Sequence, residues 1–161
     1  VVERRLITGV AYSRAETQIT LTSVPDKPGV AAEIFAPLTT KEINVDMIVQ
    51  NISEDGTTDM TFTIAKTDTD TAVAALEAKQ QALGYKKMHV NRNVAKISVV
   101  GVGMRSHAGL AQKMFHTLAE KNINILVIST SEIKISVLIA EEYTELAVRA
   151  LHTAYGLDAK E

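Results

Sequence analysis

The sequence predicts an α+β fold built from two tandem copies of one βαββαβ unit, and three observations support this. The sequence contains an internal repeat. When it is aligned with itself at a shift of 80 residues, seven pairs of residues are identical, and further along a shift of 75 gives six more identical pairs. Within each copy, segments with strand-like alternation flank segments with apolar residues at helical spacing. Finally, 161 residues with 46% hydrophobic and 22% charged residues can form one ordinary domain or two very small ones.

The two copies differ in length. The shift of 80 residues holds as far as Ile48 and its partner Ile128, after which the shift is 75, so the second copy is five residues shorter. The missing residues fall at Glu54–Thr57, which has the composition of a turn. Because hairpin tips tolerate deletions best, we infer that the chain arose by an internal duplication.

Each copy is predicted to contain the elements of a ferredoxin-like unit, with two helices packed on one sheet. In the first copy Asp26-Lys27-Pro28-Gly29 separates a strand from a helix, and Pro28 suits the first turn of that helix. The elements expected in the first copy are strands at 18–22, 45–52, 60–64 and 86–90 and helices at 30–38 and 67–83. Those expected in the second copy are strands at 97–102, 125–130 and 133–139 and helices at 110–120 and 143–154.

The second copy lacks its final strand, because the sequence ends where that strand would begin. An unpaired sheet edge is a liability for a folded protein. Residues 6–12, which precede the first copy, have strand character. We therefore expect the N-terminal strand to complete the second copy, so that the domains are 14–93 and 94–161 plus 1–13.

Composition excludes several classes of function. The chain has no cysteine, which rules out disulfides, thiol nucleophiles and thiolate metal sites. Its net charge is −2 with both signs scattered, so neither a nucleic acid nor an anionic membrane is an expected partner. No apolar run approaches the ~18 residues of a membrane helix, and the four histidines are too dispersed for a metal site. No Walker-type loop is present, so the chain alone cannot be a nucleotide-dependent kinase.

A strand-to-helix loop recurs in both copies, as 26–29 in the first and as 106–109 in the second. A glycine at the end of each loop, Gly29 or Gly109, lets a ligand approach the backbone closely. The N–H groups of the helix start can then bind a carboxylate, and Asp26 can bind a neighbouring ammonium group. Together these groups would hold an α-amino acid by both charged ends. The alternative is that Asp26 only caps the helix and Gly29 only turns the chain.

Polar residues also interrupt the second strand of each copy, at Gln50-Asn51 and at 129–132. Gln50 and Asn51 are neutral hydrogen-bonding groups that suit a hydroxyl or an amide, whereas Glu132 carries a charge that suits an ammonium group. The duplicated fold could thus hold two different amino acids. The alternative is solvent exposure at the ends of strands.

At these residues the sequence resembles the regulatory part of bacterial aspartate kinases, which consists of two ACT domains, and it is especially similar to the small β subunit of α2β2 enzymes. The resemblance spans essentially the whole chain. The stretches that carry it are 6–11, 26–29, 42–51, 55–59, 103–107 and 128–133.

The resemblance implies effector pockets at interfaces between ACT domains. The first pocket would consist of Asp26, Gly29, Ala31 and Gln50, closed by Asn124 and Ile125 of a facing second-copy domain. The second would consist of Met104, His107, Gly109, Leu110 and Ala111, with Asn44 and Val45 opposite and Ser131 and Glu132 nearby. The resemblance implies threonine in the first pocket. Lysine-sensitive relatives often have a carboxylate where this chain has Leu126, so lysine in the second pocket is left open.

The resemblance further implies a non-catalytic, cytoplasmic chain that forms a homodimer through its ACT domains and associates with an aspartokinase catalytic (α) subunit. It would transmit feedback inhibition by threonine, and lysine where that binds, to a kinase domain outside this chain, and that domain would use ATP and Mg²⁺. The chain itself would need no cofactor. Two alternatives are a module that only assembles, without ligand, and a small enzyme in its own right, although no acid–base constellation is visible in the sequence.

Overall fold

The computed structural model describes residues 7–101 and 108–158. The strands are β1 (Ile7–Pro25), β2 (Val45–Ile52), β3 (Thr57–Ala65), β4 (Lys87–Gly101), β5 (Val127–Thr130) and β6 (Lys134–Ala140). The α-helices are α1 (Val30–Thr40), α2 (Thr69–Ala78), α3 (Gln80–Leu83), α4 (Ala108–Glu120) and α5 (Thr144–Ala154), and single 3-10 turns at Lys66–Asp68 and Glu141–Tyr143 precede α2 and α5. The predicted α+β repeat is confirmed.

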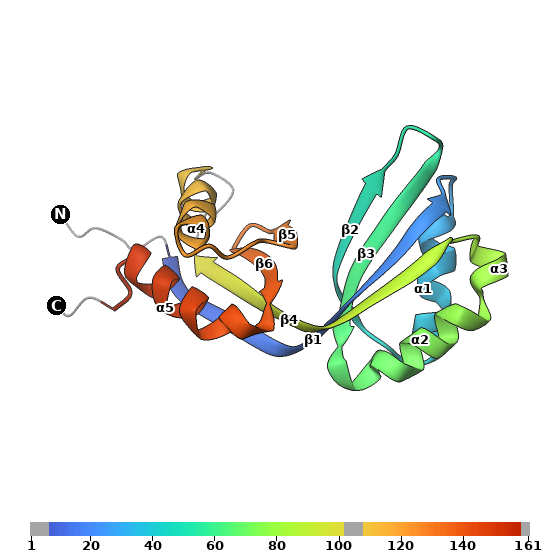
Figure 1. Cartoon of the computed structure of the whole chain (residues 1–161), viewed down its shortest axis with the longest axis horizontal. Coiled ribbons are helices and arrows are strands. Elements are labelled where there is room, and N and C mark those ends of the chain that lie inside the picture. Colours follow the sequence, from blue (N-terminus) through green and yellow to red (C-terminus); the bar gives the residue numbers. More distant parts are fainter. Residues whose placement is uncertain (1–6, 102–107, 159–161) are drawn as a thin grey trace. The chain divides into compact units, whose positions relative to one another are not determined.

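The chain divides into two compact units, Ala15–Arg92 and Asn93–Glu161 with Val1–Arg14. In the first unit the strand order is β2-β3-β1-β4, and in the second it is β1-β4-β6-β5. The N-terminal part of β1 therefore serves as the fourth strand of the second unit, as predicted. Where separate strands were expected, β1 and β4 are each one long strand that contributes to both units (Figure 1).

The core of the first unit lies between the sheet and its helices. Ile19 is paired with Phe62 and Leu21 with Met60 across β1 and β3, and all four side chains are almost completely buried. Phe35 of α1 meets Phe62 edge-on, with ring centroids 5.3 Å apart. Each fully buried apolar side chain contributes about 1.5–3 kcal/mol to the free energy of folding. The alternation of apolar and polar residues along the strands therefore determines which face of the sheet the helices cover.

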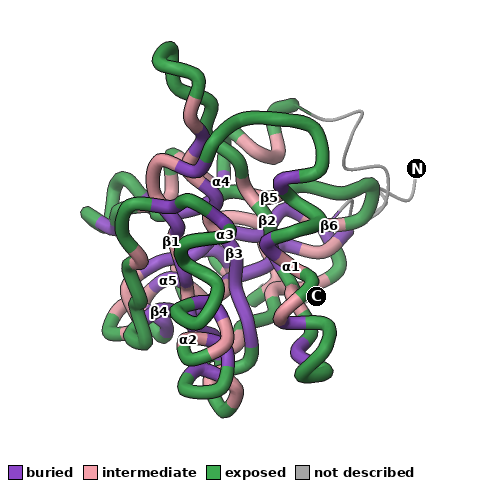
Figure 2. The backbone as a smooth tube through the Cα atoms, turned by 90° about the vertical axis from the view of Figure 1, so that its right-hand side faces the viewer, coloured by how far each residue is buried: buried purple, intermediate pink, exposed green. Residues whose placement is uncertain are grey.

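The second unit repeats this arrangement with its own core. Ile97 of β4 pairs with Val137 of β6, and both pack in one cluster with Met114 and Leu118 of α4 and Leu151 of α5. Figure 2 shows buried residues spread along the strands, whereas on the helices they alternate with exposed ones. The burial pattern of residues 121–130 is identical, position by position, to that of 41–50, as the duplication predicts.

Some local predictions were wrong. β5 begins at Val127, not at 125, although the N–H of Leu126 already bonds to β6. The helix expected at 67–83 is broken at Lys79, where φ is −108°. Pro28 lies in the turn before α1, because Gly29, with φ of 90°, is the N-cap of this helix. Among the described helices, none is long and apolar enough to span a membrane.

Candidate functional site

The loop that joins β1 to α1 is set by a β-bulge in the strand that leads into it. The pairing of β1 with β3 shifts between Leu21 and Val24, and Ser23 has a left-handed φ of 55°. The N–H of Ser23, which leaves the ladder at this point, donates to Oδ1 of Asp59 at 2.9 Å. Bulges of this kind bend a strand and redirect its end, so the hydrogen bond to Asp59 helps to set the direction in which the loop leaves β1.

Asp26 ties this loop to the tip of the β2–β3 hairpin. Its N–H donates to the carbonyl of Gly56 at 3.0 Å, while its side chain is exposed. Its carboxylate makes no hydrogen bond or ion pair with the rest of the described chain, and the start of α1 has no side-chain cap. The alternative in which Asp26 serves only as a helix cap is therefore wrong. Gly29, by contrast, does turn the chain, in a conformation that favours glycine.

The first turn of α1, which follows this loop, offers N–H groups to solvent. The N–H of Val30 bonds back to the carbonyl of Lys27 at 3.2 Å, and that of Glu33 to the carbonyl of Gly29. The N–H groups of Ala31 and Ala32 have no acceptor within the described part of the chain, and both residues are exposed. Such unpaired donors, together with the helix dipole, attract a carboxylate.

Gln50 lies on the sheet face that carries the helices, at its edge. It is paired directly with Met60, a core residue of that face, but it is itself exposed because β2 is an edge strand. Ile48 and Ile52, which share this face of β2, are 52% and 71% exposed. The structure thus places Asp26, the α1 start and Gln50 in one unit and leaves an apolar rim beside them.

The second copy carries only part of the corresponding arrangement among the described residues. Gly109, Leu110 and Ala111 lie in the first turns of α4, so Gly109 is helical and does not end a loop as Gly29 does. This contradicts the expectation of equivalent glycines. Met104 and His107 lie outside the described residues.

Ser131 and Glu132 form the turn between β5 and β6. The N–H of Ser131 donates to the carbonyl of Lys134 at 2.8 Å, and its Oγ accepts from the N–H of Lys134 at 3.2 Å. The hydroxyl oxygen of Ser131 thus accepts within the turn, and both Ser131 and Glu132 are exposed. On β5, Ile128 is paired with the core residue Val137 and is 45% exposed, as its counterpart Ile48 is on β2.

The residues predicted to close the pockets follow the ends of α1 and α4. Asn44 and Asn124 are exposed, while Val45 and Ile125 are half-buried against the core of their own unit. Asn44 and Val45 belong to the first unit, whereas the loop that they would face belongs to the second, and the reverse holds for Asn124 and Ile125. The role of these residues in closing a pocket therefore stays a prediction. Both pairs follow a turn of the same kind, since Glu42 and Asn122 both have φ of 58°.

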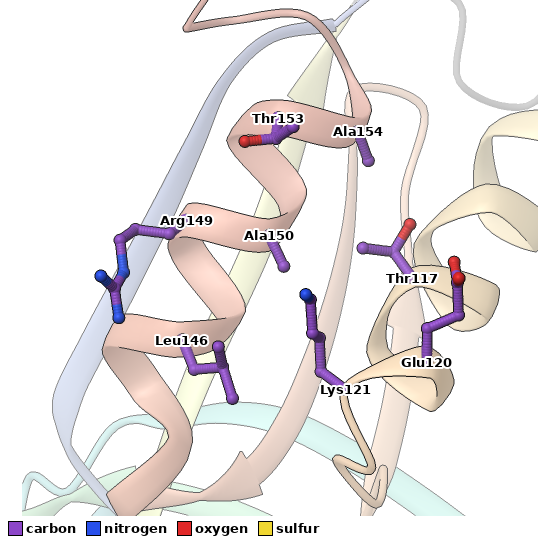
Figure 3. Close-up of a pocket in the computed structure, with 8 residues that line it drawn as sticks. All are labelled: Thr117, Glu120, Lys121, Leu146, Arg149, Ala150, Thr153 and Ala154. Carbon is purple, nitrogen blue, oxygen red and sulfur yellow. The ribbon is translucent and has the colours of Figure 1, made fainter.

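Two grooves in the described part of the chain lie elsewhere. A groove of about 570 Å³ separates α4 from α5, and Figure 3 shows Lys121 reaching from the α4 side into it while Arg149 points away. A second groove, of about 510 Å³, runs beside α1 and α3. Neither is lined by a predicted site residue. Sequence patterns give no signal for such grooves, because they depend on how two helices diverge.

Comparison with known proteins identifies the repeat. The ACT-domain family matches residues 19–80 and 97–155, one match in each copy. The aspartate kinase Ask_LysC of Stutzerimonas stutzeri is 52% identical over 157 residues, and an aspartokinase of Helicobacter pylori is 49% identical over 159. The chain spans only 38% of the length of these relatives.

Solved structures agree with this assignment. A crystal structure of aspartokinase alpha and beta subunits is 47% identical, with a TM-score of 0.88 over 93% of this chain and 99% of that one. The regulatory subunit of aspartate kinase from Thermus thermophilus is 40% identical, again with a TM-score of 0.88, over 92% and 98%. The chain therefore belongs to the ACT-domain family and is a non-catalytic regulatory region of the aspartate kinase type.

Proposed function

We propose that this chain binds free amino acids between ACT domains and thereby gives an aspartate kinase feedback control, with L-threonine at the site built from Asp26, Gly29, Ala31 and Gln50. The observation that carries the proposal is the pairing of two unlike groups. The exposed carboxylate of Asp26 lies in the loop that leads into the unpaired N–H groups of α1. An α-amino acid has the complementary pair, an ammonium group next to a carboxylate. The hydroxyl or amide partner that Gln50 offers suits the threonine side chain.

Lysine is the second ligand proposed, at the second-copy site. The support is chemical, because the exposed acid Glu132 lies in a hairpin turn of the unit that contains Gly109 and Ala111. A carboxylate in this place suits the side-chain ammonium of lysine. Leu126, where lysine-sensitive relatives often have a carboxylate, argues for weaker binding there.

Uncovered apolar residues on both edge strands support a role for a second protein surface in each site. Ile48, Ile52 and Ile128 are each between 45% and 71% exposed, and uncovered large apolar side chains often mark a surface that binds a partner. We propose that a second copy of this chain covers them in a homodimer and that a catalytic subunit, which uses ATP and Mg²⁺, binds the dimer. One relative of known structure contains alpha and beta subunits together.

Sites shared between domains link ligand binding to assembly. A ligand shifts an equilibrium only by the difference between its affinities for the two states. A coupling free energy of about 1–3 kcal/mol would give roughly 5–150-fold control of the kinase. At 100 times its dissociation constant, threonine should stabilise the folded state by about 2.7 kcal/mol.

Thermal unfolding and calorimetry with L-threonine and L-lysine test the proposal. The variant Asp26→Asn should bind threonine more weakly and keep its melting temperature, because the carboxylate makes no contact within the described chain. Glu33→Gln is the matched control, since it removes an exposed acid from the first turn of the same helix. Melting curves that neither amino acid moves would refute the proposal and favour a module that only assembles.

A further inference from the structure

The groove between α4 and α5 is bounded by two helices that the core of the second unit holds in place. Met114 and Leu118 of α4 and Leu151 of α5 are fully buried in that core. Beyond the end of α5, the hydroxyl of Tyr155 donates a hydrogen bond to the carbonyl of Leu110, near the start of α4. The groove is therefore a fixed feature of the folded unit, and its volume of about 570 Å³ falls in the usual range for ligand sites, about 300–1,000 Å³.

One wall of the groove is aliphatic and the other carries a positive charge. Leu146 and Ala150, which are one helical turn apart on α5, line the groove and are half-buried. Figure 3 shows the side chain of Lys121, the residue that follows α4, reaching into the groove toward α5. Because the side chain of Ala150 is small, space remains between the two walls. The groove thus places one ammonium group beside an aliphatic surface.

No carboxylate of the described chain neutralises this ammonium group. Lys121 makes no side-chain hydrogen bond or ion pair with the described residues. Glu120, which also lines the groove, has its Oε1 3.3 Å from Nε2 of His116 on the same helix. The guanidinium group of Arg149 points away from the groove (Figure 3). The charge that faces the groove without a partner is therefore positive.

The two hydroxyl groups that line the groove already act as donors within the chain. The hydroxyl of Thr117 donates to the carbonyl of Lys113 at 2.7 Å, and that of Thr153 donates to Oδ2 of Asp158 at 2.6 Å. A ligand in the groove would therefore find its donor in the ammonium group of Lys121. A lysine ammonium has three donors and no acceptor, so it selects an anionic acceptor such as a carboxylate.

The first copy does not combine these features. Lys41 is the counterpart of Lys121, and the N–H of each bonds to the carbonyl three residues earlier at 3.2 Å, so their backbones are placed alike. Lys41 does not line the groove beside α1. The counterpart of Leu146 is Thr71, which is polar and exposed. The inward lysine and the aliphatic wall are thus specific to the second copy and do not follow from the shared fold.

We propose that the groove between α4 and α5 binds a small aliphatic carboxylate. Its carboxylate would pair with the ammonium group of Lys121, and its hydrocarbon part would lie on Leu146 and Ala150, where it leaves water. This site is separate from the strand-to-helix loops, so the proposal does not depend on amino-acid binding there. A ligand that contacts both helices should stabilise the second unit by mass action.

The test is a titration of the 161-residue chain with hexanoate, followed by amide NMR. Three further probes separate the contributions, since hexylamine reverses the charge, acetate lacks the aliphatic tail, and inorganic phosphate is an anion without any tail. Lys121→Gln removes the charge, and Lys41→Gln is the matched control at the equivalent position of the first copy. Ala150→Leu fills the groove, and Ala75→Leu is its control, because Ala75 is the half-buried counterpart in α2. Melting curves establish that each variant is folded.

We expect hexanoate to move the amide signals of Thr117, Lys121 and Ala150 in a saturable way, and acetate, phosphate and hexylamine to bind more weakly. Lys121→Gln should weaken hexanoate by about two- to fivefold, the contribution of an exposed ion pair, and Ala150→Leu should abolish binding, while both controls bind as the wild type does. The proposal fails if hexanoate causes no saturable shift at these signals, or if hexylamine or phosphate binds as well as hexanoate. Equal losses in Lys121→Gln and Lys41→Gln would also overturn it.

Discussion

Replacing Glu42 with glycine should stabilise the protein, because this residue occupies a backbone conformation that favours glycine. Glu42 follows α1 with φ of 58°. Its N–H donates to the carbonyl of Thr39 at 2.9 Å, and the N–H of Ile43 donates to the carbonyl of Leu38, also at 2.9 Å. These two bonds define a Schellman turn, whose left-handed position usually carries glycine. Leu38 and Ile43 are both buried in the first core, so the turn is held in place.

The size of the effect follows from two opposing contributions. The left-handed conformation costs an L-residue about 1–2 kcal/mol, and glycine avoids that cost. Glycine also makes the unfolded chain more flexible, which costs about 0.5–1 kcal/mol. The side chain of Glu42 is exposed and has no hydrogen bond or ion pair within the described chain, so no contact is lost. We expect Glu42→Gly to raise the free energy of unfolding by about 0.5–1 kcal/mol, or a few degrees in melting temperature.

The second copy provides the control. Asn122 occupies the equivalent turn with the same φ of 58°, and its N–H donates to the carbonyl of Ala119 at 2.9 Å. Because asparagine tolerates the left-handed region better than glutamate does, Asn122→Gly should leave stability almost unchanged, and Glu42→Asn should recover part of the gain. Urea denaturation measures all three variants. A Glu42→Gly protein that unfolds at lower urea, or equal gains at both positions, would refute the reasoning.

Two further predictions concern the effector loop and the tyrosines. Gly84→Ala and Gly156→Ala should both destabilise the protein, since φ is 78° and 69°, but only the first places a Cβ 3.2 Å from Pro25, where the loop begins. Calorimetry should thus show weaker threonine binding for Gly84→Ala alone, and equal affinities would contradict this. Burial raises the pKa of Tyr155 to about 12 and also raises that of Tyr85, so the stability these groups contribute is complete below pH ~10 and declines as pH rises toward 12. Tyr155→Phe should flatten that decline in melting curves, and an unchanged slope would count against it.

The architecture could be read from the sequence because it depends on patterns repeated over many residues. The duplication and the alternation of apolar residues were enough to predict the two βαββαβ units and the strand that the N-terminal segment adds to the second copy. They could not show that β1 and β4 continue through both units, because the polar stretches near residues 13–17 and 91–93 look like breaks between separate strands. Whether a strand continues through such a polar stretch depends on its pairing with neighbouring strands that are distant in the sequence.

The geometry of the candidate site could not be predicted from the sequence, because it too depends on contacts between distant residues. The contacts that hold the loop and the helix start join residues distant in sequence, as in the bond from Ser23 to Asp59 and that from Tyr155 to Leu110, 36 and 45 residues apart. The glycines show the limit of local patterns as well. Gly29 and Gly109 align in the repeat, yet one precedes its helix and the other lies within it. Identity of residue type between copies therefore predicted position in the fold but not backbone conformation.

The differences between the copies explain how a duplicated fold can respond to two ligands. The strands, cores and helix ends are alike, so both sites inherit one framework. What has diverged lies at exposed positions: the loop of the first copy carries the carboxylate of Asp26, and the two hairpin turns differ. Changes at such exposed positions cost little stability, whereas they alter the charges and donors that a ligand meets. Duplication followed by divergence at such positions can therefore create a second specificity without a second fold, and Asp26→Asn should change the affinity ratio of the two sites by weakening the first alone.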